Sequence, residues 1–315
     1  MFELFKATSP IRFMRYSKPA SWLSALLIIG SLASLSINWI NWGLDFTGGT
    51  LIEVGFEQPA VLPDIRETLS EASFPGAIVQ HFGSSHEIMI RIAPKEGVKG
   101  VVIGTQVLEA LQGADYGNVD MRRIEFVGPN VGEELAEDGG LAIIIALICI
   151  MIYVSARFEW RLAAGAVLAL AHDIIITLGV FSVFQLEFDL TVLAALLAVV
   201  GYSLNDTIVV FDRIRENFRL QATSTPDEVV DNSITQTLNR TMITSGTTIF
   251  VLVSLFVVGG ALIHGFSTAL LIGIFVGTYS SIYVASSLAV KLGLNRDHMI
   301  PEVIEKEGAD QDALM

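Results

Sequence analysis

The most constraining feature of this sequence is a block of fifty residues, 241–290, that contains no Asp, Glu, Lys or Arg. Across the chain, 52% of the residues are hydrophobic, 17% are charged, and the mean hydropathy is +0.59. A soluble domain carries about 25% charged residues, and a helix that crosses a bilayer needs about 20 apolar ones. The sequence therefore predicts an α-helical membrane protein and excludes a soluble globular enzyme and a disordered chain.

Charge-poor blocks divide the chain into predicted spans. Four further blocks carry one acid or none, and the fifty-residue block is long enough for two helices that separate at residues 259–265. Basic side chains precede the first block, but its apolar core is long, so we expect an uncleaved anchor and not a signal peptide. We predict six transmembrane helices, at residues 21–40, 139–156, 162–184, 190–211, 241–258 and 266–289.

Lysine and arginine gather on one side of these spans. The two short loops on the other side, residues 185–189 and 259–265, carry neither. Short loops rich in Lys and Arg stay in the cytoplasm. This predicts cytoplasmic termini (1–20 and 290–315), a cytoplasmic loop (212–240) and a periplasmic insert (41–138). The basic residues assigned to the cytoplasmic side are Lys6, Arg12, Arg15, Lys18, Arg157, Arg161, Arg213, Arg215, Arg219, Arg240, Lys291, Arg296 and Lys306.

The insert at residues 41–138, between the first two spans, has the size of one small domain. It contains 16 acidic and 6 basic side chains from Asp45 to Asp138. This excess of acidic residues fits a solvated surface, and contact with a basic or unfolded polypeptide stays an alternative. The predicted order is β-α-β-β-α-β, the motif of ferredoxin-like α+β domains. Apolar periodicity predicts strands at 50–56, 77–82, 87–93 and 119–127 and helices at 62–72 and 98–111.

The fourth predicted span contains one acid, Asp206, in an otherwise largely apolar segment. An acid at the centre of a bilayer costs about 2.5–3.5 kcal/mol on insertion scales, so it needs a reason. Tyr202 lies one helical turn earlier, and Ser203 and Asn205 keep this stretch polar. Two interpretations stay open: Asp206 loads and unloads an ion, or it is permanently paired and holds two helices together.

Arg240 immediately precedes the fifth predicted span, at the depth expected for the cytoplasmic end of the fourth. It is the obvious cation to pair with Asp206, although an arginine at a span boundary also reaches lipid headgroups. Four hydroxyl side chains follow and form a face suited to close helix packing or to a hydrated path: Thr244, Ser245, Thr247 and Thr248.

Asp173, beside His172, lies near the middle of the third predicted span. It is either a second proton carrier or a structural hydrogen-bonding residue. In the loop at 212–240, Thr225, Pro226 and Glu228 form a helix start with a capping box. An apolar stripe follows, which predicts a short amphipathic helix on the membrane face that ends near Arg240: Val230, Ile234 and Leu238.

No catalytic, metal or cofactor site is predicted. Cys149 is the one cysteine, without a second Cys or a His at ligand spacing, and a net charge of −14 has the wrong sign for a nucleic-acid partner. An intramembrane aspartyl protease built on Asp173 and Asp206 is disfavoured. The two acids are expected at different depths, and the Gly-x-Gly-Asp signature is missing.

Four segments resemble signatures of the SecF family, which is similar in fold to the resistance-nodulation-division superfamily of transporters. They are Gly-Leu-Asp-Phe-Thr-Gly-Gly-Thr (43–50), Val-Gly-Pro-Asn-Val-Gly-Glu-Glu-Leu (127–135), the run from Gly-Tyr-Ser-Leu-Asn-Asp to Arg-Glu-Asn (201–217), and Asn-Arg-Thr-Met-Ile-Thr-Ser-Gly-Thr-Thr (239–248). The resemblance covers nearly the whole chain. It implies a subunit that uses an H⁺ or Na⁺ gradient to complete the export of unfolded polypeptide after the SecA ATPase step.

The resemblance also implies partners and roles. SecD is expected as an obligate partner that completes the ion path, with the SecYEG channel, indirectly SecA, and YajC and YidC as neighbours in the bacterial inner membrane. It assigns ion conduction to Asp206 and Arg240, with Asp173 as a further candidate. Five glycines are expected to tether the outer domain: Gly43, Gly48, Gly49, Gly128 and Gly132. Half of a small-molecule exporter and a purely structural translocon subunit are the alternatives.

Overall fold

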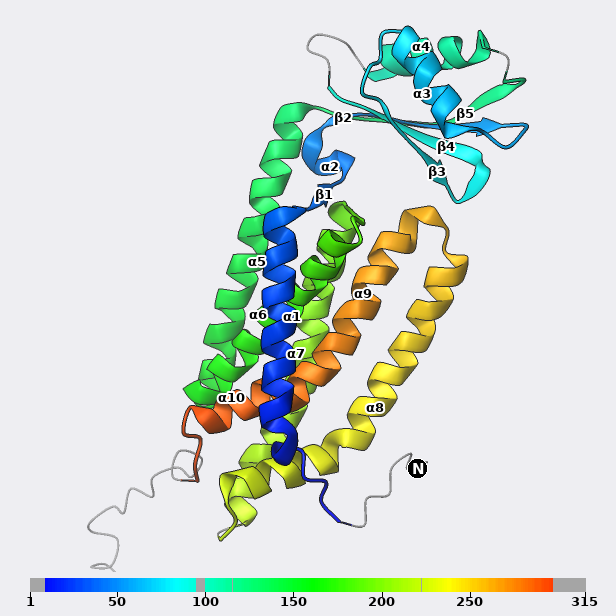
Figure 1. The fold of residues 1–315 in the computed structure, drawn as a ribbon. Coiled ribbons are helices and arrows are strands. Elements are labelled where there is room, and N and C mark those ends of the chain that lie inside the picture. The colour runs from blue at the N-terminus through cyan, green and yellow to red at the C-terminus, as the bar shows by residue number, and fades with distance from the viewer. Residues whose placement is uncertain (1–8, 95–99, 115, 222, 297–315) are drawn as a thin grey trace, which may run out of the picture.

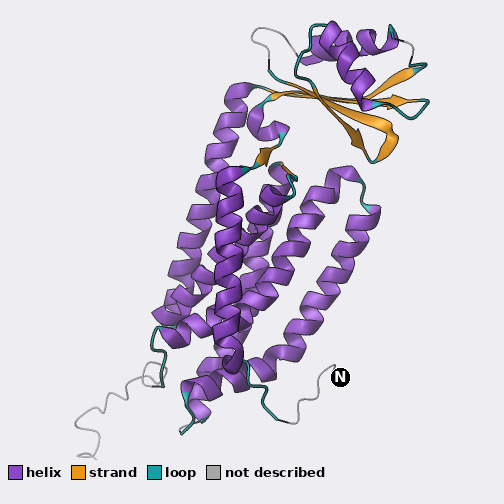
Figure 2. Cartoon of the chain, viewed as in Figure 1, coloured by secondary structure: helices purple, strands orange, loops and turns teal. Residues whose placement is uncertain are grey.

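A helical bundle carries a small α/β domain at one end (Figures 1 and 2). This computed structural model describes residues 9–94, 100–114, 116–221 and 223–296. Within them, six helical segments are long and apolar enough to cross a membrane. They are Met14–Ile37, Asn130–Arg157, Trp160–Val183, Leu190–Leu220, Pro226–Val258 and Leu262–Lys291.

The bundle consists of α1 (Ser17–Ile37), preceded by the 3₁₀ turn η1 (Met14–Tyr16), then α5 (Pro129–Arg157), α6 (Trp160–Val183), α7 (Leu190–Leu220), α8 (Pro226–Val258) and α9 (Ala261–Ser280). The last span continues through a π-helical turn, η2 (Ser281–Ala285), into α10 (Ser286–Lys291). Helices α6 and α7 are the most enclosed, with 61% and 50% of their apolar windows buried, against 11% in α5 and 17% in α8. The outer helices therefore leave broad apolar faces for lipid or for partner helices.

The α/β domain, here called the sheet domain, contains β2 (Gly49–Phe56), α3 (Leu62–Glu71), β3 (Ile78–Phe82), β4 (Ser84–Ile92), α4 (Gly100–Gln112) and β5 (Val119–Val127). The four strands lie in the order β3-β4-β2-β5, and every neighbouring pair is antiparallel. Both helices cover one face of the sheet, and the other face points toward the bundle (Figure 1). The strand order places β2, the first strand, in the middle of the sheet.

The core of the sheet domain follows from the alternation of its strands. Ile88 and Ile90 on β4 bury the same face as Ile52 and Val54 on the neighbouring β2, because alternate residues of a strand point to the same side. Helices α3 and α4 cover that face with Ile65, Leu69, Ile103, Val107 and Leu111. Each fully buried aliphatic side chain contributes about 1.5–3 kcal/mol, which stabilises the domain without a disulfide.

Helix α8 differs from the sequence-based expectation. The capping box at Thr225 and Glu228 is confirmed, but no separate amphipathic helix ends near Arg240, because α8 runs without a break from Pro226 to Val258. Its first turns cross the end of the bundle before the helix bends upward beside α9 (Figure 1). Val230 and Ile234 are buried there against the end of α7, so the apolar stripe is packed inside the protein and not on a membrane face.

Helix α5 is also longer than the predicted span. It begins at Pro129, ten residues before residue 139, because proline suits the first turn of a helix and the following Glu133 and Glu134 are exposed and can face water. The predicted tether residue Gly132 therefore lies inside a helix. A Cβ atom there would come within 2.8 Å of the carbonyl oxygen of Phe46, so Gly132 permits close contact between two elements.

Short elements join the sheet domain to the bundle. Strand β1 (Asn41–Trp42) pairs in parallel with β6 (Glu187–Phe188), which connects the end of α1 to the loop between α6 and α7. The short helix α2 (Leu44–Thr47) follows, and Trp42, Phe46 and Phe188 form an aromatic cluster. Next, Gly49 adopts φ +123°, and a Cβ there would lie 2.4 Å from the Ile92 carbonyl oxygen. This tether region is thus closely packed.

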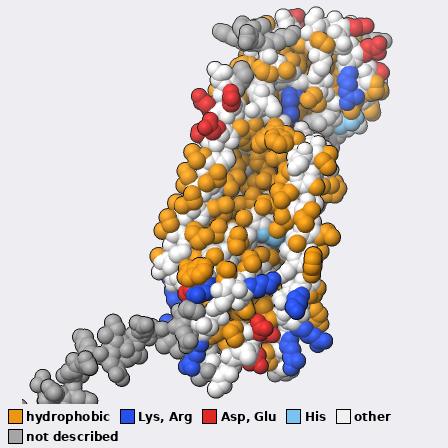
Figure 3. Space-filling view, turned by 60° about the vertical axis from the view of Figure 1, so that its left-hand side comes forward, with side chains coloured by type: hydrophobic (Ala, Val, Ile, Leu, Met, Phe, Trp, Pro, Cys, Tyr) orange, Lys and Arg blue, Asp and Glu red, His pale blue; other side chains and the backbone are white. Residues whose placement is uncertain are grey.

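A single ion pair links the open face of the sheet to this connection. The Arg91 guanidinium on β4 pairs with the Glu187 carboxylate on β6 and donates a 3.2 Å hydrogen bond to the Trp42 carbonyl. The opposite end of the molecule is different in character: Lys and Arg side chains gather there, around the end of the bundle (Figure 3). We call these the sheet end and the basic end.

Candidate functional site

Asp206 lies on α7 at the junction with α8 and α9, and only 3% of its surface is exposed. The Ser245 hydroxyl on α8 lies 3.3 Å from Asp206 Oδ2 and donates to it. The same hydroxyl oxygen is 3.0 Å from Thr278 Oγ1 on α9. The Ser245 hydroxyl therefore connects the carboxyl group of Asp206 to the Thr278 hydroxyl on α9. Because a hydroxyl both donates and accepts, this arrangement accommodates either a charged or a protonated carboxyl.

Arg240 does not pair with Asp206 in this structure. Its residue is exposed, and none of the salt bridges within the described residues includes it. It lines a hollow of about 660 Å³ at the basic end, between α5, α7 and α8. Val209 lines the same hollow, only three residues after Asp206. The hollow thus extends from the basic end to within one helical turn of the carboxylate.

The predicted hydroxyl residues of α8 differ in their hydrogen-bond partners. Tyr202 on α7 donates a 3.2 Å hydrogen bond to Thr248 on α8, and Ser245 reaches Asp206. Thr244 and Thr247 instead donate to carbonyls of their own helix. Asn205 is exposed on α7. Of this predicted set, Ser245, Tyr202 and Thr248 therefore connect α7 to α8.

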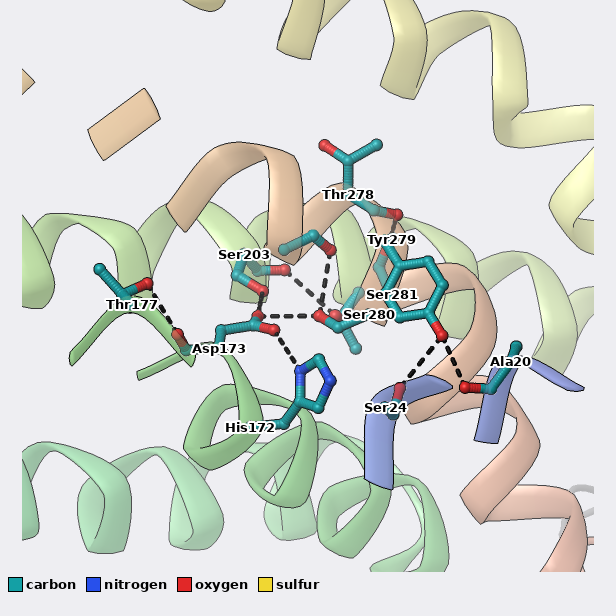
Figure 4. Close-up of polar contacts among 12 residues, drawn as sticks. Ala20, Ser24, His172, Asp173, Thr177, Ser203, Thr278, Tyr279, Ser280 and Ser281 are labelled. Atoms are coloured by element: carbon teal, nitrogen blue, oxygen red, sulfur yellow. Dashed lines mark hydrogen bonds and ion pairs between the residues drawn. The ribbon is translucent and has the colours of Figure 1, made fainter. Parts of the chain in front are cut away.

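A second buried carboxylate, Asp173 on α6, has a fuller set of partners (Figure 4). It is 0% exposed. Ser203 on α7 and Ser280 on α9 donate to its Oδ2 at 2.7 and 2.8 Å, and His172 Nδ1 lies 2.9 Å from its Oδ1. Thr177 donates to the backbone carbonyl of Asp173 at 2.8 Å. These contacts connect α6 to α7 and α9, so the cluster joins three helices.

The imidazole of His172 extends the cluster toward α1. Its ring stacks on Tyr279 with the centroids 6.3 Å apart, and the Tyr279 hydroxyl donates to the Ala20 carbonyl at 2.8 Å and lies 3.1 Å from Ser24 Oγ. His172 Nε2 is buried and has no hydrogen-bond partner among the described residues. A neutral imidazole that donates from Nδ1 to the carboxylate fits these contacts, because it leaves Nε2 as an unprotonated acceptor.

The two acids are connected through α7. Ser203, which the sequence groups with Asp206, bonds to Asp173 instead, and it precedes Asp206 by three residues on the same helix. Residues three apart lie on one face of a helix. A shift of α7 that changes the contact of Asp206 with α8 therefore also changes the contact of Ser203 with α6.

A π-helical turn begins directly after Ser280. Residues Ser281–Ala285 form η2 between α9 and α10, and the side-chain hydroxyl of Ser286 donates to the backbone carbonyl of Ser281. Such a turn holds one extra residue and is common at functional sites. Here it follows the residue that gives α9 its contact with Asp173.

The two buried acids lie in separate hydrogen-bonded clusters. In the described parts of the chain, no cluster of three or more His, Cys, Asp or Glu could hold a metal ion. Among the described residues, Asp173 and Asp206 share no hydrogen-bond partner, whereas the acids of an aspartyl protease share a proton. The sequence identified both acids, but it did not identify Ser280, Thr278 or Tyr279. The one signal that could have done so is the run of hydroxyl residues at 278–281 in a charge-free span.

Comparison with known proteins places the chain in a family. The C-terminal family of SecD/SecF protein-export membrane proteins matches residues 106–295, and the SecD/SecF GG motif matches residues 33–60. The protein translocase subunit SecF of Vibrio alginolyticus is 62% identical over 314 residues, which is all of both chains. The chain belongs to the SecF family. The SecF of Escherichia coli O157:H7 is 53% identical over 96% of this chain and 94% of its own length.

Two of the solved structures that match are of SecDF, and this chain covers 39% of each of those longer chains. The translocon-associated SecDF of Thermus thermophilus is 35% identical with a TM-score of 0.83, over 92% of this chain. This chain spans only 39% of that SecDF chain. A SecDF in a super-membrane-facing form matches with the same identity and coverage but a TM-score of 0.69. This SecF-family chain is therefore a multi-pass membrane protein with the SecDF membrane fold.

Proposed function

We propose that this SecF-family chain works with SecD to couple an ion gradient to the last stage of protein export. In this proposal, the pair uses the H⁺ or Na⁺ gradient across the bacterial inner membrane to complete the transfer of unfolded polypeptide after the SecA ATPase step. No other cofactor is invoked. The SecYEG channel would be the neighbouring complex, with SecA acting indirectly and YajC and YidC as further partners.

The observation that carries the proposal is the environment of Asp206. The Asp206 carboxyl group is 3% exposed, accepts a hydrogen bond from the Ser245 hydroxyl on α8 and interacts electrostatically with Arg240 without a salt bridge, although an acid inside a bilayer is costly without a function. The hollow lined by Arg240 extends to within one turn of it. Asp206 would bind the ion, and Arg240 would approach when the carboxylate is empty and charged. Asp173 would transmit the change through Ser203.

The energy available is adequate for such a movement. One charge that crosses a potential of 100 mV releases about 2.3 kcal/mol, which is comparable with breaking one hydrogen bond to a charged group. A change at Asp206 would shift α7 against α8. The loop that precedes α7 carries Glu187, the ion-pair partner of Arg91 on the sheet domain, so the shift would reach the sheet domain directly.

We also infer the placement of the chain in the membrane and the class of its sheet domain. The concentration of Lys and Arg at the basic end supports cytoplasmic termini and a periplasmic location for residues 41–138. The antiparallel order β3-β4-β2-β5, with α3 and α4 on one face, supports a ferredoxin-like α+β domain. The sheet domain would then stand on the side where exported polypeptide emerges.

The test compares Asp206→Asn with Asp212→Asn in membrane vesicles that also contain SecD and SecYEG. Asp212 provides the same chemical change on the same helix, but its side chain is 47% exposed at the basic end. We expect Asp206→Asn to reduce the completion of export to the level seen when the ion gradient is collapsed, because the carboxyl can no longer exchange its ion. We expect Asp212→Asn to retain the response to the gradient.

Two alternatives give different results. For a purely structural subunit, Asp206→Asn would retain gradient-dependent export if the complex still assembles, and Arg240→Met would leave ion flux at the wild-type level. For half of a small-molecule exporter, neither variant would affect export of a secreted protein. Wild-type export with Asp206→Asn in an assembled complex would therefore contradict the proposed coupling.

A further inference from the structure

We propose that the hollow at the basic end is a binding site for the phosphate of an anionic phospholipid headgroup. The hollow has a volume of about 660 Å³ and lies between the ends of α5, α7 and α8. This binding site goes beyond the export function and does not depend on it. It is argued from charge, from side chains without partners and from the apolar surface beside the hollow.

The lining of the hollow is strongly basic. Five arginines line it together with two acids, Asp212 and Glu216. Asp212 is shared by Arg157 at 3.2 Å and Arg215 at 2.9 Å, and Glu216 pairs with Arg213 at 2.6 Å. Two carboxylates thus form ion pairs with three of the five guanidinium groups, and the lining of the hollow keeps a net positive charge. The five arginines are Arg157, Arg213, Arg215, Arg219 and Arg240.

Arg219 and Arg240 carry that excess. Neither side chain forms a salt bridge with any residue that the structure describes, and both line the same hollow from two different helices. A guanidinium presents a planar set of N–H donors that matches a phosphate better than a point charge does. A phosphate between α7 and α8 would supply a hydrogen-bond acceptor to both side chains, although Arg240 also interacts electrostatically with Asp206.

The surroundings favour a lipid over a free anion. On α5, Ile152 and Tyr153 are 64% and 57% exposed within two turns of Arg157. On α8, Met242 and Ile243 are exposed directly after Arg240. Apolar surface therefore continues from both walls of the basic hollow into the bundle. A ligand with an anionic head and acyl chains fits both parts, and basic pockets between transmembrane helices bind such headgroups.

The experiment measures lipid retention by the purified full chain. Wild-type protein is placed in nanodiscs of phosphatidylcholine with a minority of phosphatidylglycerol, and the lipids that remain bound are identified by native mass spectrometry. We expect preferential retention of phosphatidylglycerol. Each charge near a membrane surface changes affinity by about fivefold, so Arg157→Gln/Arg219→Gln should reduce this retention about 25-fold. Arg219→Lys, which keeps the charge, should retain most of it.

The matched control is Arg15→Gln/Lys18→Gln, which removes two charges from the same end of the protein. Both residues are exposed and neither lines the hollow, so retention should stay within about twofold of wild type. An equal loss of phosphatidylglycerol retention in this control would mean that the lipid binds to any positively charged surface at this end of the protein. That result would overturn the proposal. Circular dichroism checks that both double variants keep the helical content of the wild type.

Two further arms separate the possible ligands. Excess inorganic phosphate should not displace phosphatidylglycerol, and displacement would mean that the hollow takes a free anion. The same measurement on the complex with SecD should again show retention that depends on Arg219. If the isolated chain retains phosphatidylglycerol in a way that depends on Arg219 and the complex with SecD does not, the hollow is a protein interface and the lipid proposal is wrong. Export assays play no part in these outcomes, so failure here is distinct from failure of the coupling proposal.

Discussion

Glu187 is a half-buried acid at the sheet end, outside the predicted spans. Burial raises its pKa above the ordinary value of 4.5, and the nearby Asp189 and Asp45 act in the same direction, whereas Arg91 lowers it. The folded chain therefore holds this proton to higher pH than the unfolded chain does. The stability that Glu187 contributes is present at low pH and is lost as the pH rises from 4.5 through the raised value.

Replacing Glu187 removes this titration. We expect the wild-type melting temperature in detergent to decline relative to that of Glu187→Gln as the pH rises from 4 toward neutrality, with a smaller pH dependence in the variant. Glu71→Gln, which removes an exposed carboxylate from the same domain, serves as the control. A wild-type curve parallel to that of Glu187→Gln over this range would contradict the assignment.

Ser280 is the residue that brings α9 into the Asp173 cluster. Ser280→Ala removes one of two hydroxyl donors from a carboxylate that is fully buried, so we expect a loss of about 1.5–3 kcal/mol of stability, as for a hydrogen bond to a charged group. Ser281→Ala is the matched control, because that hydroxyl donates to the Thr278 backbone carbonyl. Equal melting temperatures for the two variants would show that the Ser280 contact adds no stability.

At the level of residues, the sequence revealed the acids and some of their partners, such as His172 and Ser245, but not Ser280. Asp173 and Asp206 are conspicuous because each is an isolated charge in an apolar run. Ser280 gives no such signal, because serine and threonine are common in membrane helices and usually bond to their own backbone. The pairing of Ser203 with Asp173 depends on how α6 and α7 are rotated against each other, which residue spacing within one helix does not determine.

The start of α8 offers a prediction at the scale of a helix. Thr225 accepts a hydrogen bond from the Glu228 backbone N–H, and the Glu228 side chain accepts one from the Thr225 backbone N–H. Thr225→Ala should cost about 1 kcal/mol and speed hydrogen exchange in the first turn of α8. Thr223→Ala changes an exposed threonine two residues earlier and should leave that exchange unchanged. Similar exchange in both variants would show that the cap is not needed.

Helices and strands were largely predictable because their signals are local. Apolar windows place spans to within a few residues at α6, and the capping box marks the start of α8. The predictions are wrong where a helix continues past its expected boundary. Nothing local indicates that α8 passes Arg240 without a break, because the residues between the apolar stripe and the span are compatible with both helix and loop. Burial against α7 keeps that segment helical.

For the whole molecule, the Arg91–Glu187 ion pair is the polar contact that holds the open face of the sheet against the bundle. Arg91→Gln should release this contact and broaden the distances between the sheet domain and the bundle. Spin labels on cysteines placed at Glu71 and Leu262, in a Cys149→Ser background, report those distances by electron–electron resonance. Arg123→Gln, whose ion pair with Glu125 lies within β5, is the control and should leave the distribution narrow.

The junction between the sheet domain and the bundle could not be predicted from the sequence. Strands β1 and β6 are two residues each and are about 145 residues apart in the chain, so neither carries a detectable period. The glycines at 43–49 and 128–132 are expected from the sequence to tether the outer domain. In the structure, Gly49 and Gly132 allow backbones to approach closely, and their role as hinges stays a prediction.

The π-helical turn at Ser281–Ala285 takes up one residue of the last span. Since such a turn accommodates one residue more than an α-helical turn, deleting a single residue there would let the segment revert to regular α-helix, and the helices on either side would keep their rotational phase. The same deletion within the regular part of α9 would rotate one side by about 100° relative to the other, and Ser280 could no longer face α6 while the start of α9 keeps its place. The turn therefore lets the last span change its length by one residue without losing the alignment between the polar interior of the membrane domain and the exit from the bilayer.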